Sequence, residues 1–307
     1  MAVRESGVDT VDLVILPPSR DLGGGFTVRR ALPQPQRRMV GPFIFFDQMG
    51  PVELRDGQGL DVRPHPHIGL ATVTYLFDGE ILHRDNLGSV QPIRPGELNW
   101  MSAGRGIVHS ERSPDSQRRG AAQLFGLQLW VALPADQEES APSFQHHDAD
   151  AIPSSEMDGV TVRQIVGAMD GLVSPVKTLS EMIYAEIVMA PAARYRIPGE
   201  QVERAFYLID GAVTVDGQPF APSELVILKP HAEIVLAAGE SGARLVLVGG
   251  EPFPEQRFIY WNFVSSRADR IEQAKKDWRE RRFALVPGDE QEFIPLPDDP
   301  PPPVRYP

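Results

Sequence analysis

Proline and glycine interrupt the apolar runs of this chain throughout its length. The 307 residues include 30 prolines and 27 glycines, and the apolar stretches between them are short, as at residues 72–77 and 225–228. Short apolar runs between turn-forming residues are typical of β-strands, whereas helices need longer uninterrupted segments. The chain is therefore predicted to be all-β, and it is long enough for two domains of ordinary size or one large one.

One late segment, residues 265–282, has a different periodicity. Its apolar residues recur at steps of three and four positions, at Ala268, Ile271, Ala274 and Trp278. This spacing puts them on one face of a helix. We expect one helix here, with its apolar face packed on a barrel and its charged residues in solvent.

Two parts of the chain resemble each other. Residues 72–80 read TVTYLFDGE and residues 205–213 read AFYLIDGAV, and each contains an Asp-Gly pair, which is a strong hairpin signal. Each is followed by a turn that begins with proline, at 95–98 and 222–225. An internal duplication with roughly 130 residues between copies leaves room for one small β-barrel per copy.

The predicted organisation follows from this duplication. A polar, proline-containing stretch lies between the copies, and a run of four prolines near the end cannot enter a sheet. We expect a first barrel at 1–135, a linker at 136–155, a second barrel with the late helix at 156–286, and a proline-rich tail at 287–307 that runs over the surface or in solvent.

Charge and composition exclude several classes of function. The net charge of −12 argues against direct binding of nucleic acid, which needs a clustered basic face. The absence of cysteine excludes disulfides, thiolate zinc sites and cysteine nucleophiles. The apolar run near the N-terminus is too short and too charged for a signal sequence or a membrane span. We therefore expect a soluble, cytoplasmic protein without membrane contact.

Two short pairs of residues carry metal-binding side chains. His65 and His67 flank one proline, and His109 and Glu111 flank a serine. Residues two apart in a strand point to the same face, so each pair offers two ligands in one direction. A proline before each residue of the first pair restricts the backbone and lowers the entropy lost on aiming the two imidazoles. This pattern predicts a metal site built from nitrogen and oxygen.

Longer blocks around these pairs resemble the pirin family of cupins. They read HPHIGLATVTYLFDGE at 65–80, PGELNWMSAGRGIVHSE at 95–111 and LFGLQLWVALP at 124–134, and the similarity extends over about residues 26–285. The resemblance implies two tandem cupin barrels, a bicupin. It also implies that His65, His67, His109 and Glu111 hold one divalent metal ion, Fe(II) in pirins, although Mn, Ni, Co, Cu and Zn accept the same donors.

The chain departs from the family pattern beside the first pair. Many pirins read HPHRGFET where this chain has HPHIGLAT, with Ile68, Leu70 and Ala71 at the changed positions. Ala71 replaces the general cupin glutamate, so Glu111 must supply the carboxylate. The lost arginine at position 68 weakens any transfer of a signalling surface from those relatives.

The second copy lacks the ligand pair. Counting back from Gly211 by the same offsets gives Ile197 and Gly199 where the first copy has its histidines, and His231 is alone near the second motif. We therefore expect the second barrel to be free of metal and structural.

The remaining histidines and aromatic residues have simpler interpretations. His83 lies outside both pairs, so we interpret it as a hydrogen-bonding residue at most and not as a ligand. His146 and His147 fall in the predicted linker and are expected to be exposed. Residues 102–106 are glycine-rich but lack the spacing of a phosphate loop, which favours a tight turn. Four large residues are expected to pack the first barrel, one or two of them beside the metal: Trp100, Met101, Phe125 and Trp130.

The resemblance implies two main functions. One is a quercetinase-like dioxygenase, in which the metal binds the deprotonated 3-hydroxyl of a flavonol beside O2, and Glu111 serves as ligand and base. Its partners would be a small aromatic, flavonol-like substrate and O2, and the protein would be a monomer. The alternative is an iron-dependent, redox-sensing regulator that binds a transcription factor or metabolic enzyme as its protein partner. A small cupin isomerase or a storage fold ranks last.

Overall fold

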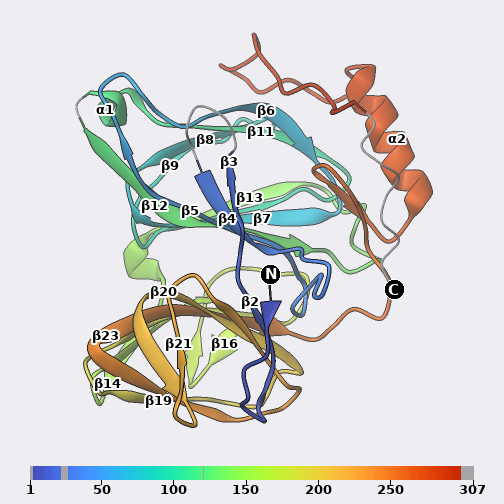
Figure 1. The fold of residues 1–307 in the computed structure, drawn as a ribbon. Helices are drawn as coiled ribbons and strands as arrows, with labels where there is room; N and C mark the ends of the chain where they lie inside the picture. Colours follow the sequence, from blue (N-terminus) through green and yellow to red (C-terminus); the bar gives the residue numbers. More distant parts are fainter. Residues whose placement is uncertain (1–2, 22–26, 120, 299–307) are drawn as a thin grey trace. The chain divides into compact units, whose positions relative to one another are not determined.

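The computed structural model describes residues 3–21, 27–119 and 121–298, which fold mainly as β-strands (Figure 1). The helical elements among them are α1 (Asp115–Arg118), α2 (Ala268–Arg279) and the short 3-10 helix η1 (Ala149–Ala151). No helix in this described part has the length and apolar character needed to span a membrane.

The chain forms two compact units, and neither is continuous in sequence. One lies within Met1–Asp21, Val28–Asp47 and Asp150–Pro252, and the other within Leu22–Thr27, Gln48–Ala149 and Phe253–Pro307. This differs from the linear division at 1–135 and 156–286. The start of the chain belongs with the second copy, and the late helix belongs with the first. We call the barrel within 48–149 the N-terminal barrel and the barrel within 150–252 the C-terminal barrel.

The N-terminal barrel is made of two sheets. Its strands are β6 (Asp61–His67), β7 (Leu70–Asp78), β8 (Ile81–Asp85), β9 (Val90–Ile93), β10 (Leu98–Ser102), β11 (Ile107–Arg112), β12 (Ala122–Ala132) and β13 (Ser143–His147), with the second half of β5 (Phe43–Leu54). One sheet has the order β13-β10-β7-β12-β5 and the other the order β6-β11-β8-β9. Because β6 is an edge strand, it tolerates prolines that cannot donate to a ladder.

The C-terminal barrel is built around one large sheet with the order β1-β2-β22-β20-β23-β18-β15-β14. The elements of this unit are β1 (Val3–Arg4), β2 (Val11–Ile15), β3 (Ser19–Asp21), β4 (Thr27–Leu32), β14 (Ser154–Met157), β15 (Val160–Val166), β16 (Ala168–Met169), β17 (Leu172–Val173), β18 (Met182–Met189), β19 (Arg194–Ile197), β20 (Glu203–Val215), β21 (Gln218–Phe220), β22 (Leu225–Leu228) and β23 (Ile234–Gly250). Strand β2 pairs with β22, so the N-terminal segment covers what would otherwise be a bare sheet edge.

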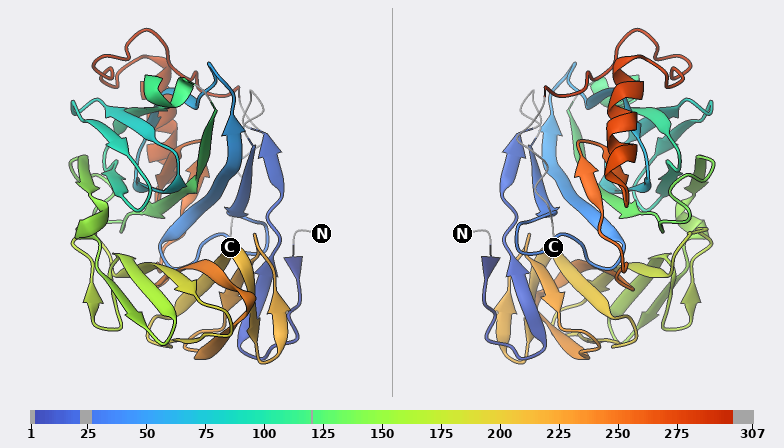
Figure 2. Two further views of the ribbon diagram at one scale, coloured as in Figure 1. Left: turned by 90° about the vertical axis from the view of Figure 1, so that its left-hand side faces the viewer. Right: turned by 90° about the vertical axis from the view of Figure 1, so that its right-hand side faces the viewer.

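The predicted helix is present as α2 and packs within the unit of the N-terminal barrel (Figure 2). Its buried residues Ile271 and Ala274 join a cluster with Ile68 and Phe263. Phe263 belongs to the hairpin of β24 (Phe258–Tyr260) and β25 (Phe263–Ser265). The apolar face of the helix is therefore buried, as expected. The helix belongs to the unit of the first copy, however, and not to that of the second copy, to which the sequence assigned it.

The two Asp-Gly pairs do not form hairpins. Gly79 has a φ of +88° and connects β7 to β8, which lie in different sheets. Gly211 has a φ of +77° and lies inside β20, where the pairing with β23 shifts register on both sides. The hairpin prediction is wrong at both places, because the positive φ that a hairpin turn needs also serves a corner between sheets and a bulge. The tight turn predicted at 102–106 is present, with Gly106 N donating to Ala103 O at 2.9 Å.

The segment predicted as a linker contributes to the barrel. Strand β13 pairs with β10 along its whole length. Upstream of it, the buried carboxylate of Glu138 accepts hydrogen bonds from Ser265 Oγ at 2.9 Å and from the Ser266 backbone N–H at 2.7 Å. Part of the segment 136–155 is therefore built into the fold, through the pairing of β13 and the buried carboxylate of Glu138.

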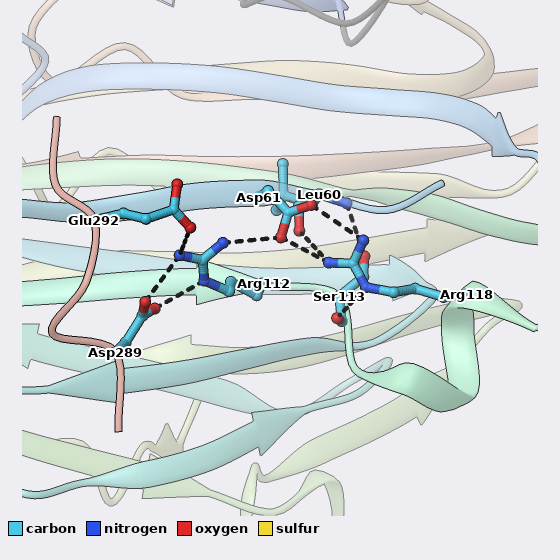
Figure 3. Close-up of polar contacts among 7 residues, drawn as sticks. All are labelled: Leu60, Asp61, Arg112, Ser113, Arg118, Asp289 and Glu292. Atoms are coloured by element: carbon cyan, nitrogen blue, oxygen red, sulfur yellow. Dashed lines mark hydrogen bonds and ion pairs between the residues drawn. The ribbon is translucent and has the colours of Figure 1, made fainter. Parts of the chain in front are cut away.

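The described part of the tail, residues 287–298, is fixed to the N-terminal barrel. Ile294 N donates to Pro64 O on β6 at 2.8 Å. Arg112 at the end of β11 forms a two-pronged contact with Asp289 at 2.8 Å and also reaches Glu292 (Figure 3). Because of this contact with Arg112, the pKa of Asp289 lies below its usual value. The prolines at 300–303 lie outside the described residues.

Candidate metal centre

Strands β6 and β11 bring the two predicted pairs together (Figure 1). They pair antiparallel, with His65 directly opposite His109 and His67 opposite Ile107. Opposed residues in an antiparallel ladder share a face, as do residues two apart on one strand. Three imidazoles are therefore directed to the same side of this sheet.

The turn after His67 fixes the end of β6. Gly69 has a φ of +66°, and a Cβ added there would lie 2.0 Å from Val264 O. No residue other than glycine fits this close approach. Gly69 N donates to Gly104 O at 2.9 Å, which connects the turn after β6 to the turn before β11.

The three histidines form one buried cluster whose geometry suits a metal ion. His65, His67 and His109 are 6%, 1% and 1% exposed, and each offers a ligand atom within 4.8 Å of the others. The Nε2 atoms of His67 and His109 are 3.1 Å apart. Two nitrogens about 2.1 Å from one ion and at right angles are about 3.0 Å apart. Since two facing imidazole nitrogens repel unless a proton or a cation lies between them, this donor set fits a metal.

Electrostatics keep these imidazoles neutral. Burial lowers the pKa of His65 to about 4, and burial together with the neighbouring imidazoles lowers the pKa of His67 and of His109 well below the usual value. His65 Nδ1 donates to the backbone carbonyl of Arg63 at 2.9 Å, which leaves its Nε2 with a free lone pair. At neutral pH protons therefore do not compete with a metal for these nitrogens.

Glu111 lies beside this cluster but is not one of the three groups whose ligand atoms converge. The pairing of β11 with β6 shifts between His109 and Glu111, and Glu111 lies opposite Val62. Its Oε1 accepts a hydrogen bond from Thr74 Oγ1 at 3.2 Å. Burial raises the pKa of the Glu111 carboxyl, although His83 and Thr74 act in the opposite direction. A carboxyl with a raised pKa close to a metal-binding cluster is suited to proton transfer.

His83 also lies in the barrel interior, on β8, and it is 3% exposed. Its Nδ1 lies 3.4 Å from His109 Nδ1, and its Nε2 lies 3.1 Å from Asp85 Oδ2. Sequence reasoning missed Asp85, although His83 and Asp85 are two residues apart in a strand, the same pattern that identified the ligand pairs. It also missed Thr74, for which no signal was present.

The aromatic residues divide between core and site. Trp100 and Met101 are buried, and Phe125 packs against Phe77, as expected of barrel packing. Trp130 meets the ring of His67 edge-on, with ring centroids 5.2 Å apart. One of the four predicted residues therefore contacts the metal-binding cluster.

His146 and His147 are half-buried and not exposed as expected. His146 Nδ1 lies 2.8 Å from Asn99 Oδ1, and its Nε2 lies 3.2 Å from Asp148 Oδ1. His146, Asp148 and Glu97 form a second group of potential ligands at the edge of the sheet. Their opposite charges pair with each other when His146 is protonated.

The C-terminal barrel has an apolar interior at the corresponding positions. Ile197 is fully buried in a cluster of aliphatic and aromatic side chains, including Phe206 and Leu236. His231 lies on the surface, with Nδ1 3.1 Å from Gly199 O. Among the described residues, the grouping of potential metal ligands in a barrel interior is found only in the N-terminal barrel.

Comparison with known protein families agrees with this arrangement. The model of the Pirin family matches residues 25–131, and that of the Pirin C-terminal cupin domain matches residues 184–284. Together these two matches cover more than half of the chain. The chain belongs to the pirin family.

Several pirin relatives and structures are similar over nearly the whole chain. A pirin-like protein of Caulobacter vibrioides is 46% identical over 94% of this chain and 100% of its own length. A Pseudomonas aeruginosa protein provisionally named quercetin 2,3-dioxygenase is 41% identical over 85% of this chain and 81% of its own. A crystal structure of quercetin 2,3-dioxygenase from Acinetobacter baumannii has a TM-score of 0.87 and 34% identity, and covers 95% of this chain and 96% of that one.

The two family models match different barrels. The three clustered histidines and Glu111 all lie within the region matched by the Pirin model, and Ile197 lies within the region matched by the C-terminal cupin model. Both barrels are therefore cupins, and the potential metal centre belongs to the first.

Proposed function

We propose that this chain is a metal-dependent dioxygenase of the quercetin 2,3-dioxygenase type, which opens the ring of a flavonol with O2. In this proposal His65, His67, His109 and Glu111 hold one divalent ion, with Fe(II) as the first candidate. The observation that carries the proposal is the convergence of three buried, neutral imidazoles beside a carboxyl with a raised pKa. The names of the Pseudomonas and Acinetobacter relatives support the choice of reaction.

The residues of the site have distinct tasks in this proposal. A divalent ion bound here supplies Lewis acidity to the flavonol 3-hydroxyl and redox chemistry toward O2. The histidines hold it without adding charge, because burial keeps them neutral. Glu111 accepts the hydroxyl proton as it moves off the ion when substrate binds, and burial then makes the released carboxylate a stronger base than an exposed one. The Thr74 hydroxyl orients that carboxylate by donating to Oε1. Trp130 provides an apolar wall beside His67.

The test compares the wild type with Glu111→Gln, which keeps the size of the side chain but removes the base. Each protein is loaded with Fe(II), mixed with quercetin in air, and followed by flavonol absorbance and CO release. We expect turnover in the wild type and a loss of about 100-fold or more in the variant, the scale of a general base. Asp170→Asn is the matched control, because it neutralises a carboxylate that accepts from Tyr195 Oη in the C-terminal barrel unit and lies outside both groups of potential ligands, so it should leave turnover unchanged.

Other outcomes have definite meanings. No turnover by wild-type protein that holds iron tightly and cycles its oxidation state would overturn the oxygenase and favour the redox-sensing regulator. Wild-type protein that retains no metal after loading would overturn both. Full turnover by Glu111→Gln would keep the oxygenase but remove the assignment of Glu111 as base.

A further inference from the structure

His83 and Asp85 occupy a defined position relative to the metal-binding cluster. Both lie on β8, which pairs with β11 so that Asp85 is opposite His109 and His83 is opposite Glu111. Both side chains are almost fully buried. The ring of Phe144 stacks on the ring of His83, with centroids 4.5 Å apart and planes 15° from parallel. The His83 ring is therefore held in one plane and cannot turn freely.

With one proton on each of the two imidazole rings, a single arrangement gives every contact in the row Asp85–His83–His109 a donor and an acceptor. Asp85 accepts hydrogen bonds at Oδ1 from the backbone N–H groups of Leu87 at 2.9 Å and Ser89 at 3.0 Å. Although burial opposes it, hydrogen bonding from His83 and Ser89 lowers the pKa of Asp85, so this carboxylate is ionised and only accepts. His83 Nε2, 3.1 Å away, must therefore carry the proton.

The same accounting continues to the ligand. With its proton on Nε2, His83 has a bare Nδ1, which faces His109 Nδ1 at 3.4 Å. His109 Nδ1 is then the donor of this contact, and its Nε2 has the free lone pair. That Nε2 is the atom that lies 3.1 Å from His67 Nε2. The row Asp85–His83–His109 thus ends in a lone pair directed into the cluster.

We propose that His83 and Asp85 are positioning residues of the metal centre, which fix the tautomer of His109 and raise the basicity of its Nε2. This inference rests on the metal site of the proposed function. His65 donates to a backbone carbonyl. His109 instead contacts His83, which in turn contacts the carboxylate of Asp85. Hydrogen-bonding partners of this kind contribute about 10–100-fold to metal affinity.

Asp85→Asn is the sharpest variant, because the surroundings dictate how asparagine sits. The two backbone N–H groups at Leu87 and Ser89 hold its oxygen, so its NH2 group faces His83 Nε2. His83 must then accept at Nε2 and carry its proton on Nδ1, where it opposes the proton on His109 Nδ1. We expect Ni(II), titrated calorimetrically into the apoprotein, to bind about 10–100-fold more weakly than in the wild type.

Two variants at His83 separate polarity from packing. In His83→Gln, the amide oxygen can accept from His109 while the NH2 group donates to Asp85, so the row is preserved. His83→Leu removes both hydrogen bonds of the row, because leucine can neither donate nor accept. We expect Ni(II) affinity to stay within about threefold of the wild type in the first and to fall about 10–100-fold in the second. Asp170→Asn is the matched control and should bind Ni(II) as the wild type does, because its carboxylate accepts from Tyr195 Oη in the C-terminal barrel unit and belongs to neither group of potential ligands.

A second readout needs no metal and no activity. Long-range proton–nitrogen NMR of the histidine rings in the apoprotein reports which nitrogen carries the proton. We expect Nε2–H on His83 in the wild type and Nδ1–H in Asp85→Asn. The inference is overturned if the wild-type protein binds Ni(II) but Asp85→Asn binds it equally well with an unchanged His83 tautomer. Failure of the wild type to bind Ni(II) at all would instead refute the metal site.

Discussion

The two cupin barrels differ most in what their ligand-bearing strands put inside. Strand β6 of the N-terminal barrel directs His65 and His67 inward, and both are almost fully buried. The corresponding strand β19 of the C-terminal barrel directs Ile197 inward, into an aliphatic cluster. These inward-facing residues are buried in both barrels, but they are imidazoles in one and an aliphatic side chain in the other.

This difference shows how one fold supports two roles. A buried isoleucine contributes about 1.5–3 kcal/mol of stability through the hydrophobic effect. A buried imidazole must give up its proton and some of its hydration, which costs free energy unless a ligand or hydrogen bond offsets it. Under the proposed function, the C-terminal barrel contributes stability, and the N-terminal barrel gives up some stability to keep three nitrogens available for a metal.

The largest expected effect is a loss of metal affinity when an inward-facing histidine of the N-terminal barrel is replaced by an aliphatic residue like those of the C-terminal barrel. His67→Leu removes one of the three converging nitrogens, so metal affinity should fall by more than about 100-fold, beyond what a hydrogen-bonding partner alone contributes. Metal content after loading, measured by elemental analysis, checks this. The reciprocal variant Ile197→His should gain no metal, because no further ligand converges there. Metal bound in equal amounts by His67→Leu and the wild type would contradict the site.

A smaller effect is expected from opening a cavity in the second interior. Ile197→Ala should lower the free energy of unfolding by about 2–5 kcal/mol, because Ile197 is completely buried and its neighbours cannot fully collapse. Urea unfolding measures the change. Metal affinity per folded molecule should be unchanged, and a large loss of that affinity would mean that the two interiors do not have separate roles.

The smallest expected effect is a pH dependence of the metal-free protein. The pKa of His65 is about 4 in the folded state and 6.5 when unperturbed, so the unfolded chain binds the extra proton between these values. His65 does not change the free energy of unfolding above about pH 6.5, where its imidazole is neutral in both states. As the pH falls from about 6.5 toward about 4, the free energy of unfolding decreases by up to about 1.4 kcal/mol per pH unit for one proton. Urea unfolding of the apoprotein across this range measures it.

The control for this pH dependence is His65→Leu. Without the buried imidazole, the free energy of unfolding should change less steeply with pH. The difference in slope should be up to about 1.4 kcal/mol per pH unit, which corresponds to one proton. An identical slope in the variant and the wild type would show that His65 is not held neutral by burial.

Much of the candidate site was predictable because it depends on local geometry. Alternation along a strand is a property of the backbone, so His65 and His67 had to share a face if their segment was extended. A second local rule, the helical period, predicted the late helix from the spacing of Ile271 and Ala274.

Other features were decided by pairing between distant segments. The Asp-Gly pairs guaranteed a positive φ but not its use, and the sheets turned one into a corner and the other into a bulge. The polar composition of 136–155 predicted a linker, yet Glu138 is buried where distant serine groups meet it. Composition alone does not reveal such partners, since they lie far away in sequence.

The sequence by itself determined that this chain would be a two-barrel β-protein with two ligand pairs in the first copy. Strand alternation can be recognised from neighbouring residues, and the duplication from the similarity of two segments. Only the tertiary structure decided that three imidazoles converge while Glu111 lies beside them, and that His83 and Asp85 stand behind His109. The physical reason is register. The pairing of β11 with β6 shifts between His109 and Glu111, and such pairing depends on contacts between strands that are distant along the chain.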